Sequence, residues 1–224
     1  MSSIFSSSIG RKLIMSLAGL FLITFLIVHL GINSLLILFE SGDNFNVAAH
    51  FMSTNGVIRV MEIVLFGGFI LHMLYGVILQ IRNWLSRGST GYKKENHSQT
   101  SFFSKYMFHS AMVVTAFLVI HLANFYVKAR FLGETEEIIV NGKHVHDLGQ
   151  LVLDLFQMPG YVIFYMVALL FLGFHLHHGF QSAFQTLGLN HKTYSPFIEK
   201  LGIAYTIIVV AGFMAIPLVI YFTR

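Results

Sequence analysis

Four histidines carry the clearest chemical signal in this sequence, because each lies inside its own long apolar run. An ionisable side chain at membrane depth is energetically costly, so by default it marks a functional site. Neutral imidazole is also a common protein ligand of haem iron, with one ring nitrogen at each axial position. Four such residues are enough to hold two haems between pairs of imidazoles: His29, His72, His121 and His175.

The composition indicates that these histidines lie in a membrane protein. Of the 224 residues, 55% are hydrophobic and 11% are charged, about half the charged share of a soluble domain. The sequence has no cysteine, which excludes disulfides, iron–sulfur ligation and c-type haem attachment by this chain. It also has no Gly-rich phosphate loop, Rossmann fingerprint or nucleophile elbow. A dehydrogenase active site with flavin or nucleotide would therefore have to lie on another polypeptide.

Hydropathy predicts an all-α membrane protein, with five transmembrane helices in a bundle that encloses two b haems. We expect one domain over residues 1–224, with a polar loop after the first span and a tight turn at Asn141-Gly142. Pro159 is a natural place for the fourth helix to begin. The first apolar run is too long for a signal-peptide core, so it is expected to be retained. The predicted spans cover residues about 13–39, 57–81, 106–127, 161–187 and 201–222.

Lysine and arginine are distributed unevenly between the loops, and this asymmetry predicts orientation. With the N-terminus in the cytoplasm, the inner segments carry nine basic and two acidic residues. The outer segments then carry five basic and eight acidic residues. The inner set includes Lys93, Lys94 and Lys105 between the second and third spans. We therefore expect a multi-pass protein of the bacterial inner membrane with a cytoplasmic N-terminus and an external C-terminus.

Depth in the membrane divides the four histidines into two pairs. Each lies about two-thirds of the way along its predicted helix. The first and third helices run outward, so His29 and His121 fall in the outer half of the membrane. The second and fourth run inward, so His72 and His175 fall in the inner half. At 1.5 Å per residue the two levels should differ by on the order of 10 Å.

The flanking residues give the same pairs without any use of topology. FLIVHL around His29 matches FLVIHL around His121, and HMLYG from His72 matches HLHHG from His175. Two independent patterns therefore favour one haem iron between His29 and His121, and a second between His72 and His175.

Glycine follows two of the histidines at the fourth position, which lies on the same helix face. At Gly76 and Gly179 no side chain would collide with a flat macrocycle pressed against the helix. Phe25 and Phe117, four residues before the other two histidines, are placed to pack on a ring edge. Glycine in membrane helices also marks close helix–helix contacts, and histidine also hydrogen-bonds neighbouring helices.

Other histidines offer alternatives or secondary roles. His177 and His178 follow His175 closely enough to replace it as ligand, although only His175 has glycine at the fourth position after it. His178 and His109, which opens the third span on the inner side, are candidates for contacts with a haem propionate.

The whole chain resembles a known family. It has five spans, two helices with H-x-x-x-G, and the motif S-x-x-G-L-F-L-x-x-F-L-x-x-H-L from Ser16 to Leu30. Together these features resemble the single-chain, two-haem cytochrome b anchor of succinate dehydrogenases and fumarate reductases. The resemblance implies that the four histidines are axial ligands of two non-covalent b haems, and that Ser16 contacts a propionate of the inner haem. It also implies partners on the cytoplasmic face: an FAD flavoprotein and an iron–sulfur subunit. No nucleic acid is expected.

The resemblance implies electron transfer from the iron–sulfur subunit through the inner and outer haems to a quinone, usually menaquinone, in the membrane. A quinone site needs an apolar slot, polar groups for the carbonyls and a route for protons. Glu62 is the only acid well inside a predicted span, and an ion pair with nearby Arg59 is its alternative role. The polar candidates at the outer end are Glu62, Arg59, Asn33, His50 and Asn124.

Two other functions remain open at this point. A two-haem b subunit of a formate dehydrogenase or hydrogenase would share bis-histidine ligation but normally places its histidines at other spacings. A transporter whose histidines line a polar pathway is the less favoured alternative. Two b haems per purified chain would separate either cytochrome from the transporter.

Overall fold

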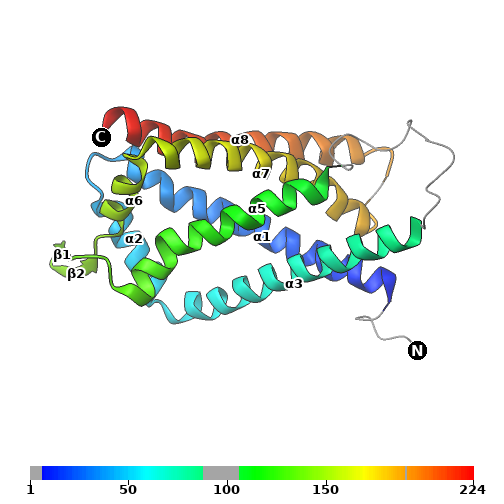
Figure 1. Cartoon of the computed structure of the whole chain (residues 1–224), viewed down its shortest axis with the longest axis horizontal. Helices are drawn as coiled ribbons and strands as arrows, with labels where there is room; N and C mark the ends of the chain where they lie inside the picture. The colour runs from blue at the N-terminus through cyan, green and yellow to red at the C-terminus, as the bar shows by residue number, and fades with distance from the viewer. Residues whose placement is uncertain (1–6, 88–105, 190) are drawn as a thin grey trace.

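Five long helices form the body of the molecule (Figure 1). The computed structural model describes residues 7–87, 106–189 and 191–224. Each of the five helices is long and apolar enough to cross a membrane, which supports a multi-pass membrane protein. They are α1 (Ser8–Leu38), α3 (Gly56–Arg87), α5 (Met107–His121) with its continuation η1 (Leu122–Leu132), α7 (Pro159–Thr186) and α8 (Ser195–Thr223).

The helix boundaries confirm most of the expected pattern and extend it. Helix α1 begins before the predicted span because the Ser7 side chain accepts a hydrogen bond of 3.0 Å from the amide of Gly10. Helix α7 begins at Pro159 as predicted. Helix α3 continues past the predicted end to Arg87. Lys93, Lys94 and Lys105 of the predicted basic loop lie outside the described residues.

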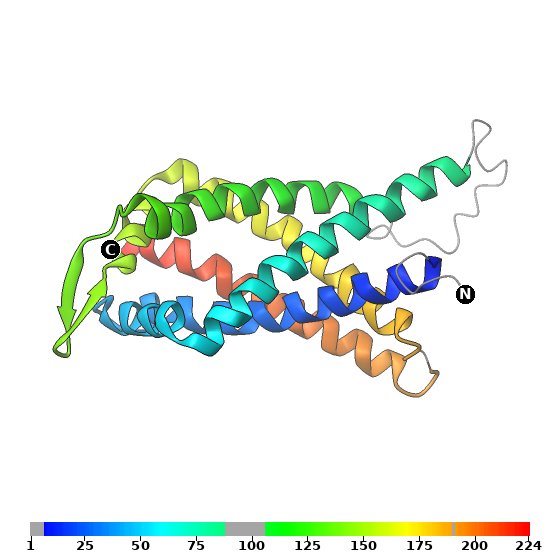
Figure 2. The same ribbon diagram turned by 90° about the horizontal axis from the view of Figure 1, so that it is seen from below.

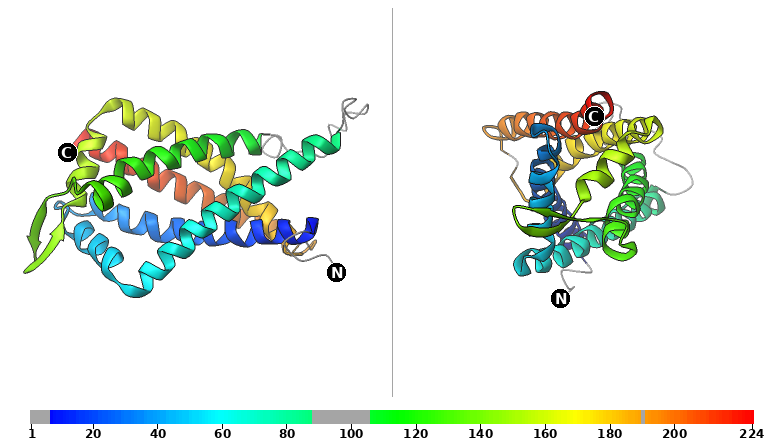
Figure 3. Two further views of the ribbon diagram at one scale, coloured as in Figure 1. Left: turned by 60° about the horizontal axis from the view of Figure 1, so that its bottom comes forward. Right: turned by 90° about the vertical axis from the view of Figure 1, so that its left-hand side faces the viewer.

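The helices pack unevenly. Helices α7 and α8 form the most extensive contact, and α1 packs against α3, α7 and α8. Helix α5 packs against α7, whereas α3 makes little backbone contact with either α5 or α7. Figures 1 and 3 show α8 on one side of the molecule and α3 on the opposite side. The buried core therefore lies mainly along α7 and α8, while α3 is peripheral.

Small residues let α7, α8 and α1 approach closely. A Cβ atom on Gly202 would lie 2.7 Å from the Phe180 ring, and one on Gly212 would lie 2.9 Å from Leu30. Close approach at glycine is the usual way to pack helices in a membrane. The Tyr205 hydroxyl adds a polar link, donating a hydrogen bond of 2.7 Å to the Ile23 carbonyl.

One end of the bundle, which we call the hairpin end, is covered by two short helices and two strands (Figure 2). The C-terminus lies at this end and the N-terminus at the opposite, N-terminal end. Asn141 and Gly142, with φ of 52° and 75°, form the tight turn that the sequence predicted. The covering elements are α2 (Asp43–Thr54), antiparallel β1 (Glu137–Val140) and β2 (Lys143–His146), and α6 (Leu148–Phe156).

One sequence prediction is wrong at the hairpin end. The segment after α1 was expected to be a polar loop, but it forms α2, which buries Phe45 and Asn46 against the rest of this end. The fold is predominantly helical as predicted, and the structure adds one short hairpin, whose Val140 and Val145 are buried. In both segments a few apolar side chains among many polar ones are enough to order the chain, because they are covered by distant segments.

A buried amide ties the covering elements together. The Asn46 side chain is 1% exposed. Its Nδ2 donates a hydrogen bond of 2.8 Å to Asp147 Oδ1, and its Oδ1 accepts one of 2.8 Å from the Gly149 amide. Asp147 also accepts from the Gln150 amide as the N-cap of α6. The segment after α1 is thereby fixed to the segment before α7.

Candidate functional site

The four histidines meet as two pairs of rings. The ring centroids of His29 and His121 lie 5.8 Å apart, with an angle of 86° between the ring planes. Those of His72 and His175 lie 6.1 Å apart, at 75°. These are the same pairs that depth and flanking residues indicated. Each pair bridges two helices whose backbones make little contact, α1 with α5 and α3 with α7.

The two pairs occupy different levels along α1. The His72 ring lies against α1 at Gly19, where a Cβ atom would come within 3.3 Å of His72 Cε1. His29 is ten residues farther along the same helix, or about 15 Å along its axis. We call His29 and His121 the hairpin-end pair, and His72 and His175 the N-terminal-end pair.

The separation within each pair suits one metal ion between two imidazoles. Metal–nitrogen bonds of about 2 Å on opposite sides of an ion put the two ring centres roughly 6 Å apart. The observed 5.8 Å and 6.1 Å match this spacing. Imidazoles in direct hydrogen-bonded contact would need a bond between ring nitrogens, and none joins the members of either pair.

In His72 the ring nitrogen that makes a hydrogen bond is Nδ1. His72 Nδ1 lies 3.3 Å from the Met15 carbonyl oxygen. A carbonyl only accepts, so His72 Nδ1 carries the proton and Nε2 keeps its lone pair. An imidazole held through Nδ1–H in this way is the usual arrangement of a metal-ligating histidine.

The other three histidines follow this pattern in part. His121 Nδ1 lies 3.4 Å from the Tyr165 hydroxyl, which can accept or donate. His29 differs, because the neighbour of its Nδ1 at 3.4 Å is Asn33 Nδ2, which only donates. The enclosed Nδ1 of His175 has no partner among the described residues. Within the described part of the chain, no hydrogen bond involves the Nε2 atom of any of the four. The Nε2 atoms are thus free of protein partners, and that of His72, whose proton lies on Nδ1, also keeps its lone pair for a metal ion.

Aromatic rings surround the hairpin-end pair. Phe25 stacks on His29 at 5.1 Å between centroids, and Phe117 lies 5.6 Å from His121. Phe213 of α8 lies 5.6 Å from His29. The two phenylalanines that the sequence singled out thus pack directly on the histidine one turn away, which limits the movement of each imidazole.

Gly76 and Gly179 leave room beside the N-terminal-end pair. A Cβ atom at Gly76 would meet no described atom within 4 Å, and one at Gly179 would meet only Met107 Cε, at 3.8 Å. Gly76 therefore does not mark a close helix–helix contact, unlike Gly202 and Gly212. Space next to the histidine is what a flat macrocycle on this helix face would require.

The residues expected to contact haem propionates differ in their exposure. Ser16 is 5% exposed and follows Met15, whose carbonyl contacts His72. His178 is half-buried on α7, and the ring beside His72 is that of His175. His109 is exposed at the start of α5, with Tyr106 5.8 Å away between ring centroids.

Glu62 has a partner that the sequence did not reveal. The Tyr126 hydroxyl donates a hydrogen bond of 2.6 Å to Glu62 Oε1. The alternative of an ion pair between Arg59 and Glu62 is wrong, because Arg59 Nε instead donates to the Ser53 carbonyl at 2.9 Å. Nothing in the sequence marked Tyr126, which is one of nine tyrosines.

The remaining quinone-site candidates are spread over the hairpin-end half. Asn33 Nδ2 donates to the His29 carbonyl at 2.8 Å. Asn124 has an enclosed Nδ2 without a partner among the described residues. His50, expected in a loop, lies in α2. In the described part of the chain no hydrogen bond joins any two of the five candidates.

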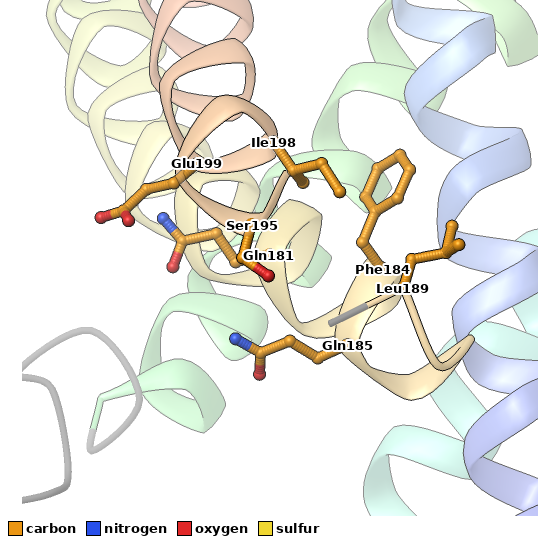
Figure 4. A pocket seen from close by; sticks show the side chains of 7 residues that line it. All are labelled: Gln181, Phe184, Gln185, Leu189, Ser195, Ile198 and Glu199. Carbon is orange, nitrogen blue, oxygen red and sulfur yellow. The ribbon is translucent and has the colours of Figure 1, made fainter. Parts of the chain in front are cut away.

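At the N-terminal end a small pocket lies between the ends of α7 and α8, as Figure 4 shows. Its polar side chains include Gln181, Gln185 and Glu199. Gln181 is six residues beyond His175, or about 9 Å along the helix. The pocket is thus separate from both histidine pairs.

Comparison of the chain with protein-family models, curated proteins and solved structures finds no match.

Proposed function

We propose that this chain is the membrane-anchor cytochrome b subunit of a succinate:quinone oxidoreductase. The proposal rests on the two histidine pairs, which lie at two levels of a five-helix bundle. The ring centroids are 5.8 Å apart within one pair and 6.1 Å apart within the other. The resemblance of the Ser16–Leu30 motif and the H-x-x-x-G repeats to that family selects this kind of cytochrome among those with two haems.

The histidines would hold two b haems without covalent attachment. His29 and His121 would hold one, and His72 and His175 the other. Bound haem supplies one-electron transfer at its iron. The protein's own part is to fix each imidazole: the Met15 carbonyl holds the His72 ring, and aromatic packing holds His29 and His121. Rigid ligands keep the change of structure with each electron small.

The N-terminal end is the proposed cytoplasmic face, where a flavoprotein and an iron–sulfur subunit would dock. The lysine and arginine excess of the inner segments supports this orientation. Electrons would enter at the N-terminal-end pair and leave at the hairpin-end pair, about 15 Å farther along α1. The FAD and iron–sulfur clusters would belong only to those partners, since this chain has no cysteine.

Quinone would react at the hairpin end, with menaquinone as the expected substrate. Glu62 is half-buried at this end and is available for proton exchange through its second oxygen, Oε2, which has no hydrogen bond to a described residue. Asn124 is the second polar candidate at this end, and its enclosed amide lies beside the Tyr165 hydroxyl. Both lie on helices that carry a paired histidine or continue from one.

Gentle detergent purification of the tagged chain from its native membrane tests the proposal. We expect a flavoprotein with covalently bound flavin and an iron–sulfur protein to copurify, and the preparation to couple succinate oxidation to quinone reduction. Copurification with a molybdenum or nickel–iron subunit would instead place the chain in another respiratory complex. A preparation without haem and without redox partners would reject the proposal.

A further inference from the structure

We propose that Tyr126 is a positioning residue that holds the Glu62 carboxylate at the quinone-reactive end. The inference rests on the proposed function, and it adds a residue that neither the sequence motifs nor the histidine pairs identify. Tyr126 donates a hydrogen bond of 2.6 Å to Glu62 Oε1. This length is typical of a hydroxyl that donates to an ionised carboxylate.

The bond joins two helices that otherwise have little backbone contact. Glu62 lies in α3 and Tyr126 in η1. The Phe66 ring, one turn beyond Glu62, lies 5.2 Å from the Tyr126 ring between centroids. Tyr126 is therefore held by an aromatic neighbour while its hydroxyl reaches the acid. The Glu62 orientation depends on this contact, because α3 supplies no other hydrogen bond to the carboxylate.

The π-helical form of η1 places Tyr126 relative to the hairpin-end histidine. The segment begins directly after His121, and Tyr126 is the fifth residue beyond it. Hydrogen bonds in a π-helix run between residues five apart, so η1 turns less per residue than an α-helix does. The ring that lies beside His121 is that of Phe125, at 5.2 Å between centroids. Tyr126, the next residue, faces α3 instead, where its hydroxyl meets Glu62 and its ring meets Phe66.

The charged groups around this contact do not replace it. Arg59 of α3 donates to the Ser53 carbonyl, and Lys128 of η1 pairs with Glu134 at 2.9 Å. Among the described residues no cation lies within 4 Å of the Glu62 carboxylate. With Oε1 bound by Tyr126, Oε2 is the oxygen left to exchange a proton with a quinone. Removal of the Tyr126 hydroxyl would free the carboxylate to rotate away.

Four variants of the intact complex test the inference: Tyr126→Phe, Glu62→Gln, the double variant, and Tyr221→Phe as control. Tyr221 is a tyrosine of α8 near the same end, and its hydroxyl has no hydrogen bond to a described residue. Haem content and succinate oxidation with an artificial electron acceptor report whether each complex is assembled. Quinone turnover reports the proposed step.

We expect Tyr126→Phe to lower the kcat for quinone by about fivefold or more, with both haems retained and Tyr221→Phe unchanged. The double variant should turn over quinone at the same rate as Glu62→Gln alone, because the hydroxyl acts through the carboxylate. A redox-induced infrared carboxyl band abolished by Glu62→Gln should shift in Tyr126→Phe. Normal turnover in Tyr126→Phe, or losses that multiply in the double variant, would overturn the inference. Absence of quinone turnover in the wild-type complex would overturn the proposed function itself.

Discussion

The imidazole rings of His29 and His121 lie 5.8 Å apart between centroids, although α1 and α5 make little backbone contact. His72 and His175 repeat this relationship between α3 and α7. In each case the two imidazole rings approach each other although the helices that carry them are not packed together. Such an arrangement separates imidazoles by the space of one metal ion, and several predictions depend on it.

Pairing determines which haem each histidine variant loses. We expect His29→Ala and His121→Ala each to remove the same haem, because one axial ligand lost from a bis-histidine site leaves the iron poorly held. The other haem should remain. Redox titration followed by optical spectroscopy measures this. If His29→Ala removed the same spectral component as His72→Ala, the assignment of pairs would be wrong.

The open space at Gly76 predicts a steric test. Gly76→Leu should prevent the haem between His72 and His175 from binding, because the new side chain would fill the space beside His72. Folding should survive, since a Cβ atom there meets no described atom within 4 Å. Gly67→Leu is the control, because Gly67 lies on the same helix with equally open space but not one turn from His72. Equal haem content in the two variants would contradict the prediction.

Tyr165 should adjust the hairpin-end haem without holding it. The hydroxyl lies 3.4 Å from His121 Nδ1, and Tyr165 itself is 4% exposed. If Nδ1–H donates to this oxygen, the bond makes the imidazole a stronger donor and favours the oxidised iron. Tyr165→Phe should then raise that midpoint potential by roughly tens of millivolts, with the second potential fixed. A redox titration that leaves both potentials unchanged would exclude this role.

The Asn46 amide should contribute to stability and not to electron transfer. Asn46→Ala removes two hydrogen bonds at a site 1% exposed and leaves the Gly149 amide without its acceptor. We expect a loss of about 2 kcal/mol in the free energy of unfolding, measured by thermal denaturation in detergent. Gln150→Ala, which removes an exposed contact with Asp154, is the matched control and should change little. Haem potentials should be unaffected in both.

The sequence was sufficient for features that depend on short segments. A long apolar run is enough to predict a spanning helix, and the turn at Asn141-Gly142 depends on two residues. The grouping of the histidines was also visible, because FLIVHL and FLVIHL repeat a local pattern. The structure brings the rings together in the same groups.

Features that depend on distant residues could not be predicted in this way. Asn46 and Asp147 are 101 residues apart, so no window of sequence contains their bond. Helix α2 gains its order from the burial of Phe45 and Asn46 under segments that come later. Glu62 and Tyr126 are 64 residues apart, so their bond also lies outside any short window of sequence.

The haem content of the purified chain tests the central claim most directly. A pyridine haemochrome assay, with protein quantified by amino-acid analysis, should give two b haems per chain, and electron paramagnetic resonance should show two low-spin ferric signals. His29→Ala should lower the content to one. A chain purified with no haem, from cells that supply haem and with its five helices folded, would contradict the account.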